Sequence, residues 1–198
     1  MNSLHPIDRP RPDWNDFNLH KYLVFCMIDS NEPYARVCKT FDNLMFEYLN
    51  WNSTRGTLAW IPVFLASLTE KQLSKILKKT GYHYHNQMAR YLIRWAKGPY
   101  SQPSYLKTAT REMIVHDITG ISWKLASMFL RNSRGLQYAV IDRYIRNYLI
   151  EKGYMGPRTG EKGYKLMEKR FIEIANDKGM TPYDLDMQIW NSKRVRHN

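Results

Sequence analysis

The stretch TREMIVHDITGISWKLASMFLRNSRGLQYAVID, residues 110–142, decides the fold of this 198-residue chain. Apolar residues recur at helical spacing on both sides of segment 119–122, where a glycine and a serine interrupt the pattern. This arrangement predicts two helices joined by a tight turn, the second beginning at Trp123 or Lys124. In such a helix-hairpin-helix unit, backbone N–H groups of the turn and the positive end of the second helix point toward a phosphate of a nucleic-acid backbone.

The rest of the chain has the same helical periodicity, and no segment shows the strict alternation of a strand bounded by hairpin turns. Thr69 and Gln72 have the spacing of a capping box, and Gly81 lies where a helix is expected to end. The sequence therefore predicts an all-α fold. The expected helices span residues 16–29, 33–50, 57–67, 70–79, 84–97, 103–118, 123–132, 142–152, 161–178 and 182–192.

We expect two lobes, with the functional site in the cleft between them. One lobe, residues 81–150, contains the helix-hairpin-helix unit, and the other combines residues 1–80 with residues 151–198. The net charge is +12, and residues 81–150 have ten basic but only three acidic side chains. Neutralising phosphates releases counterions, so this segment is the expected face toward a polyanionic partner. A solvated helix surface is the alternative interpretation of such charge.

Composition excludes several other classes of protein. Cys26 and Cys38 are too few for a four-cysteine zinc or iron–sulfur site, so we expect no metal cluster. The apolar stretch from Leu58 to Leu68 is too short to cross a membrane, and residues 1–16 lack a secretory signal. Motifs of nucleotide hydrolysis, zinc proteolysis and serine hydrolysis are missing. We therefore expect an intracellular protein.

Two residues in this region have the properties of catalytic groups. Lys124 lies in the first turn of the second hairpin helix, where the helix dipole disfavours an ammonium group and lowers its pKa, as a nucleophilic lysine requires. Asp142 follows 18 positions later and begins the next helix. Each also has an ordinary interpretation, Lys124 as a phosphate contact and Asp142 as an N-cap. Their positions alone do not decide between these roles.

Residues 118–132, ITGISWKLASMFLRN, followed by YAVIDR at 138–143, closely resemble the catalytic core of the helix-hairpin-helix DNA glycosylases. The greatest similarity is to the archaeal-type second family of 8-oxoguanine DNA glycosylase/AP lyases, which has the same separation between its lysine and its aspartate. Residues 81–89, GYHYHNQMA, and residues 185–190, LDMQIW, are similar to two further segments of that family. The resemblance covers residues 80–198, and the first eighty residues match only in size and helical character.

The resemblance implies a bifunctional enzyme that flips a damaged base, 8-oxoguanine first among the expected substrates, out of duplex DNA. Lys124 would attack the sugar C1′, form a Schiff base and lead to β-elimination of the 3′ phosphate. Asp142 would accept the lysine proton or stabilise the positive charge that develops on the sugar. No cofactor is required, although some members of the superfamily bind a monovalent cation at the hairpin backbone. An enzyme of this kind is expected to be a cytoplasmic, nucleoid-associated monomer.

The resemblance also implies a set of DNA-binding residues, with two departures from the family. Ser122 replaces a family glycine and still presents its N–H if the turn does not require a positive φ. His83 replaces an arginine that contacts the base opposite the lesion, and it cannot make the same bidentate charged contact. Trp123 fits either a DNA contact or packing. Tyr84 is the expected wedge that fills the gap left by the flipped base. The full set of expected DNA-binding residues is Gly120, Ser122, Trp123, His83, Tyr84 and Arg143.

The expected base pocket contains Trp190 and Asn198. Trp190 provides either a stacking face for the flipped base or an ordinary core contact of the last helix. The family sequence ends at a lysine that helps to recognise the damaged guanine, whereas this chain ends at Asn198. The identity of the excised base therefore stays open at this point.

Three alternatives remain beside this interpretation. A non-catalytic helix-hairpin-helix DNA-binding protein would have no reason to keep both Lys124 and Asp142, so their joint presence favours the enzyme. A monofunctional glycosylase would use the aspartate to activate water and would lack the lysine. A bifunctional glycosylase for a different modified base fits the same residues. The sequence also leaves open the preferred opposite base, and whether the enzyme serves repair or removes a programmed modification.

Overall fold

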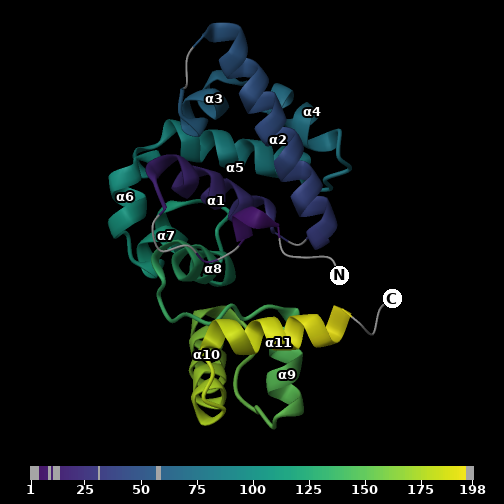
Figure 1. Cartoon of the computed structure of the whole chain (residues 1–198), viewed down its shortest axis with the longest axis vertical. Coiled ribbons are helices and arrows are strands. Elements are labelled where there is room, and N and C mark those ends of the chain that lie inside the picture. Colours follow the sequence, from purple (N-terminus) through teal and green to yellow (C-terminus); the bar gives the residue numbers. More distant parts are fainter. Residues whose placement is uncertain (1–4, 9, 11–13, 31, 57–58, 195–198) are drawn as a thin grey trace.

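The computed structural model describes residues 5–8, 10, 14–30, 32–56 and 59–194 of the chain. Over these residues the secondary structure consists of α-helices and two short 3-10 helices, without a strand (Figure 1). The prediction of an all-α fold is confirmed. Within the described part of the chain, none of the helices combines the length and the apolar character needed to cross a membrane.

Most of the expected helices are present within a few residues of their predicted limits, and the capping box of Thr69 and Gln72 forms. The prediction of a single helix over 103–118 was wrong. The chain forms two helices there, because Thr110 adopts an extended backbone and its hydroxyl accepts a hydrogen bond from the Met113 N–H at 3.2 Å. The observed elements are η1 (Pro6–Asp8), α1 (Asp16–Ile28), α2 (Tyr34–Arg55), α3 (Ile61–Ser67), α4 (Glu70–Lys78), α5 (His85–Lys97), η2 (Pro99–Ser101), α6 (Pro103–Thr108), α7 (Arg111–Asp117), α8 (Trp123–Arg134), α9 (Arg143–Glu151), α10 (Gly160–Asp177) and α11 (Pro182–Arg194).

Helix α1 lies at the centre of the larger of two packed units. Its residues from Tyr22 to Ile28 are fully buried, and it packs against α2, α3, α5, α6 and α8. A helix that is apolar on all sides is typical of such a central position. The end of α1, where Asp29 follows, is therefore fixed by contacts on every side of the helix.

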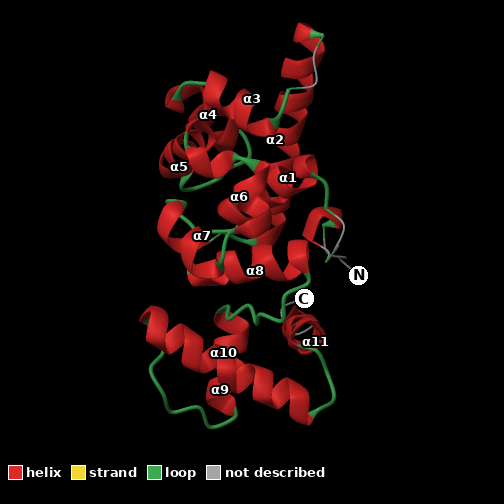
Figure 2. Ribbon diagram, turned by 90° about the vertical axis from the view of Figure 1, so that its left-hand side faces the viewer, coloured by secondary structure: helices red, strands yellow, loops and turns green. Residues whose placement is uncertain are grey.

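Helices α9, α10 and α11 form the smaller unit, which lies beneath α7 and α8 in Figure 2. Its buried cluster includes Leu149, Phe171 and Leu185, whereas the cluster of the larger unit extends from Trp14 to Val140. The buried clusters thus divide the chain near residue 140, which differs from the expected lobes 81–150 and 1–80 plus 151–198. The reason is that α4 and α5 pack on each other and on the amino-terminal helices, and α8 packs on α1. Residues 81–150 therefore do not form a core of their own.

Two ion pairs with little solvent exposure join the units. Arg111 on α7 donates to both carboxylate oxygens of Glu168 on α10, at 2.6 and 2.7 Å. Arg131 on α8 donates to Asp186 on α11 at 2.7 Å. These pairs fix the orientation of the smaller unit at the place where α8 and α9 approach each other.

Candidate active site

The hairpin has the geometry that its sequence predicts. Helix α7 ends at Asp117 and α8 begins at Trp123, and between them the Ile121 N–H donates to the Ile118 carbonyl at 3.1 Å. Ser122 is the N-cap of α8, with a φ of −91°, and its hydroxyl accepts a hydrogen bond from the Leu125 N–H at 3.4 Å. Serine therefore replaces glycine in this turn without backbone strain.

Gly120 is required in this turn for two physical reasons. Its φ is +93°, in the region that side chains with a Cβ atom rarely adopt. A Cβ atom added at this position would also lie 2.3 Å from Cδ2 of Tyr91 on α5. The glycine thus allows the hairpin to lie directly on α5.

Lys124 lies in the first turn of α8, as the sequence predicts, and its side chain is 30% exposed. Its Nζ donates to Oδ2 of Asp29 at 2.5 Å, and the Asp29 side chain is 13% exposed. Asp29 is the C-cap residue of α1, and its N–H donates to the Phe25 carbonyl at 3.0 Å. The dipole of α8 disfavours an ammonium group at this position, while the adjacent carboxylate favours one.

Asp142 is the N-cap of α9, and Oδ1 accepts a hydrogen bond from the Ile145 N–H at 2.8 Å. The capping role considered for this residue is therefore confirmed, and it coexists with a position near Lys124. Burial raises the pKa of Asp142, and the negative charge of Asp29 raises it further. The hydrogen bond from the Ile145 N–H and the positive charge of Lys124 lower it, but the pKa stays above its ordinary value. The three groups are thus close enough for their charges to interact.

Asp186 on α11 adds a third carboxylate to this region. Burial raises its pKa, the charges of Arg131 and Lys124 oppose that rise, and the charge of Asp142 adds to it. Lys124 therefore lies among carboxylates from three different elements: the end of α1, the start of α9 and the first half of α11.

Trp190 comes from α11 and is partly buried. Its ring meets the ring of Tyr34, the first residue of α2, edge to face, with 5.6 Å between the centroids. This contact places an aromatic pair at the junction of the two units. Asn198, the other residue of the expected base pocket, lies outside the described residues.

His83 and Tyr84 precede α5 on the surface of the larger unit. Tyr84 is 48% exposed, as a residue that inserts into DNA must be. The Arg36 guanidinium lies 2.7 Å from Nδ1 of His83, and Glu32 accepts hydrogen bonds from Arg36 and from the His83 N–H. Burial acts to raise the pKa of Glu32, but these hydrogen bonds outweigh it, so the pKa lies below its ordinary value. The structure thus places a permanent positive charge beside His83.

Trp123 and Arg143 have different surroundings. The Trp123 ring lies at the junction of the units, with Arg111 and Lys165 over its faces, 5.0 and 4.6 Å from the centroid. Packing accounts for this position, and a DNA contact of Trp123 stays a prediction. Arg143 is exposed at the start of α9, next to Asp142, where its guanidinium lies 5.4 Å from the Tyr144 ring.

Sequence reasoning missed Asp29, Glu32 and Arg36. The spacing of Glu32 and Arg36 is the four-residue separation of a helical ion pair, which is visible in the sequence. Nothing in the sequence connects Asp29 with Lys124, because 95 residues separate them. Only the packing of α1 against α8 brings them together.

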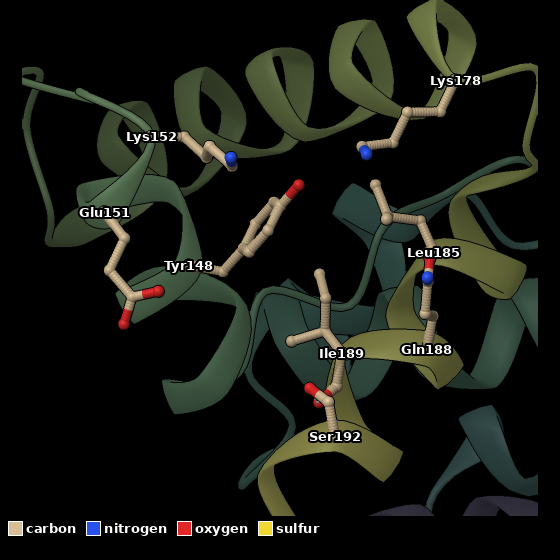
Figure 3. Close-up of a pocket in the computed structure, with 8 residues that line it drawn as sticks. All are labelled: Tyr148, Glu151, Lys152, Lys178, Leu185, Gln188, Ile189 and Ser192. Atoms are coloured by element: carbon tan, nitrogen blue, oxygen red, sulfur yellow. Dashed lines mark hydrogen bonds between the residues drawn. The ribbon is translucent and has the colours of Figure 1, made fainter.

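The described residues also contain a surface cavity of about 480 Å³, which lies in the smaller unit (Figure 3). It is lined by Tyr148, Lys152, Lys178, Leu185 and other residues of the smaller unit, and by neither Lys124 nor Asp142. No group of three or more His, Cys, Asp or Glu side chains in the described part of the chain is placed to hold a metal ion. A cation at the hairpin backbone stays a prediction.

Comparison with known proteins is consistent with this geometry. A model of the 8-oxoguanine DNA glycosylase family matches residues 8–180. The chain belongs to this family. The match includes the amino-terminal helices, in which the resemblance of individual motifs was weakest, and therefore extends the family assignment over both units.

Several relatives in this family have similar sequences. The 8-oxoguanine DNA glycosylase/AP lyase of Thermoplasma volcanium is 32% identical over 127 residues, which are 62% of this chain and 62% of that protein. The protein of the same name from Sulfolobus acidocaldarius is 28% identical over 176 residues, 85% of this chain and 78% of that protein.

Solved structures of family members show the same fold. The 8-oxoguanine glycosylase/lyase of Methanocaldococcus jannaschii, crystallised with a 15mer DNA containing 8-oxoguanine, has a TM-score of 0.71 at 22% identity. The alignment covers 92% of this chain and 84% of that one. The 8-oxoguanine DNA glycosylase of Thermotoga maritima has a TM-score of 0.68 at 21% identity, with coverage of 89% and 79%.

The close contact of Gly120 with Tyr91 generates a stability prediction. Gly120→Ala should lower the free energy of unfolding in urea by about 2–4 kcal/mol, because it adds an overpacked methyl group to an unfavourable φ. Gly135→Ala is the matched control, since Gly135 also has a positive φ of 67° but nothing within 4 Å of its added Cβ. It should cost about 1 kcal/mol. Equal losses in the two variants would show that the contact with Tyr91 is unimportant.

Proposed function

We propose that this chain is a bifunctional 8-oxoguanine DNA glycosylase/AP lyase. The observation that supports this most strongly is the meeting of Lys124 and Asp142 behind a helix-hairpin-helix turn, in a chain of this family. Neither a backbone-binding module nor a glycosylase that activates water needs a lysine beside the aspartate. Both groups belong to one chain, so a single copy contains the complete catalytic pair, and the proposed enzyme acts as a monomer on DNA inside the cell without needing a residue from a second copy.

The proposed chemistry uses side chains only and needs no cofactor. The Lys124 ammonium loses one proton, and the amine then forms a bond to C1′ while the bond from C1′ to the base breaks and its electron pair leaves with the base. The ring bond from C1′ to O4′ opens to give a Schiff base. Of the three ammonium protons, one ends on the released base, one on O4′ and one on the iminium nitrogen. Loss of a C2′ proton then expels the 3′ phosphate.

Asp142 is placed to stabilise this reaction electrostatically. Its carboxylate is anchored by the Ile145 N–H, so it cannot turn away as positive charge develops on the sugar. Because the site is buried, a fixed negative charge there acts more strongly than it would in water. The same burial raises the pKa of Asp142, so the negative charge that stabilises the sugar is lost at a higher pH than for an exposed aspartate.

The remaining predicted residues bind and distort the DNA in this proposal. The hairpin, with Gly120 and the N-cap Ser122, binds a phosphate beside the lesion through backbone N–H groups. Tyr84 occupies the space that the flipped nucleotide leaves in the stack. Trp190 stacks on the flipped base, a contact that contributes about 1–3 kcal/mol in other systems.

Substitution of the lysine tests the proposal directly. Borohydride should trap a covalent adduct between the wild type and duplexes that contain 8-oxoguanine or an abasic site, but not uracil or an undamaged sequence. Lys124→Gln should abolish the adduct on both substrates and leave a shift in DNA mobility. Lys107→Gln is the matched control, because Lys107 also forms a 2.5 Å ion pair with an aspartate but lies on α6. It should trap normally.

The outcomes separate the alternatives. An adduct on the abasic site alone would keep the lysine chemistry and point to a different base. A shift in mobility without any adduct, equal in wild type and variant, would contradict the enzyme and leave a DNA-binding protein.

Asp142→Asn separates catalysis from capping. Asparagine caps helices about as well as aspartate, so the free energy of unfolding should change by less than about 1 kcal/mol. Adduct formation should slow by about 100-fold to 1,000-fold, because the negative charge beside the sugar is lost. In the wild type, protonation of Asp142 through its raised pKa should add a second fall in rate at acidic pH to the one caused by protonation of Lys124, and the variant should lack only this second fall. A wild-type rate in a folded variant would refute the assigned role.

A further inference from the structure

Asp29 is in direct contact with the proposed nucleophile, and the proposed chemistry has not yet used it. Its Oδ2 lies 2.5 Å from the Lys124 Nζ. It comes from the C-cap of α1, whereas Lys124 opens α8, so the pair depends on the contact between these two helices. Neither side chain extends into open solvent, since they are 13% and 30% exposed.

The backbone holds Asp29 firmly in this position. The seven preceding residues are fully buried, and the Asp29 N–H closes the last turn of α1 on the Phe25 carbonyl at 3.0 Å. A charged hydrogen bond that a lysine donates to an anchored carboxylate restricts a long side chain whose freedom is otherwise large. Lys124 therefore has a defined position before DNA binds.

The electrostatic surroundings of Lys124 come from every element packed near it. Its own helix contributes the positive end of a dipole and Arg131, which is paired with Asp186. The start of α9 contributes Asp142, and α11 contributes Asp186. Among these groups, Asp29 makes the direct contact with Nζ, and an opposite charge at this distance favours the charged form of its partner.

We propose that Asp29 is a positioning residue for the nucleophile: its carboxylate fixes Lys124 Nζ at the junction of the two units and sets the pH above which the reactive amine becomes available. This inference rests on the proposed role of Lys124. The role differs from that of Asp142, whose Oδ1 accepts a hydrogen bond from the Ile145 N–H at the start of α9. At low pH, Asp29 keeps the Lys124 amine protonated and fixed in position. At higher pH the amine loses its proton while Nζ stays at the same place.

The test is the pH profile of adduct formation on an abasic-site duplex, measured under single-turnover conditions. Asp29→Asn removes the charge, so the midpoint of the rising limb should move down by about one pH unit, and the plateau rate should fall about tenfold because Nζ is no longer fixed. Asp142 should reinforce the shift, because the charge of Asp29 raises its pKa. The loss relative to wild type should therefore be smallest at acidic pH.

Two further variants separate charge from position and from stability. Asp29→Glu keeps the charge on a longer side chain, so it should restore the wild-type midpoint with a reduced plateau. Asp16→Asn is the matched control at the other end of α1, where Asp16 pairs with Lys107 at 2.5 Å. It should leave both the midpoint and the plateau unchanged.

A direct titration makes the result independent of catalysis. The ε-carbon resonance of Lys124, assigned by its disappearance in Lys124→Gln, should titrate about one pH unit lower in Asp29→Asn than in the wild type. Equal midpoints in wild type and Asp29→Asn, or a rate loss of the same size at every pH, would overturn the inference. Failure of the wild type to form any adduct would instead overturn the proposed function, and the NMR midpoints would still decide the role of Asp29.

Discussion

The position of the proposed active site depends on the buried ion pair between Arg111 and Glu168. Lys124 belongs to the larger unit and Asp142 opens the first helix of the smaller unit, so the two groups meet only if the units keep one orientation. Arg111 reaches across the junction to both oxygens of Glu168, and its guanidinium lies 4.1 Å from the Tyr138 ring centroid. Breaking such a pair typically costs about 3–5 kcal/mol, because one charge is left buried without a partner.

The charges around Lys124 form a balanced arrangement. A helix N-terminus disfavours the ammonium, while the carboxylates of Asp29, Asp142 and Asp186 favour it. Arg131 neutralises part of the negative charge by pairing with Asp186. The lysine is therefore neither a free surface amine nor a fully buried cation.

The sequence predicts much of this structure because much of it is local. Helical periodicity, the Thr69 capping box and the Gly120 turn each depend on residues a few positions apart, and the structure confirms them. The break between α6 and α7 was missed because the apolar residues keep their helical spacing across it. Only the capping hydrogen bond of the Thr110 side chain marks the start of α7.

The rest depends on contacts between distant segments. The division into units depends on which helices pack their apolar faces together. Periodicity shows that a helix has an apolar face but not which other helix packs against it. Lys124 and Asp142 were predicted from their motif, but their neighbours Asp29 and Asp186 come from opposite ends of the chain. Likewise, His83 was predicted as a departure from the family, whereas the Arg36 guanidinium beside it became visible only in the folded chain.

The central claim is that the Lys124 amine bonds to the sugar of the lesion. The most direct measurement is to reduce the adduct on an 8-oxoguanine duplex with borohydride, digest protein and DNA, and locate the modified residue by mass spectrometry. We expect a sugar remnant on the peptide that contains Lys124, attached to its side-chain nitrogen. A remnant on another lysine or on the amino terminus, with the Lys124 peptide unmodified, would contradict it.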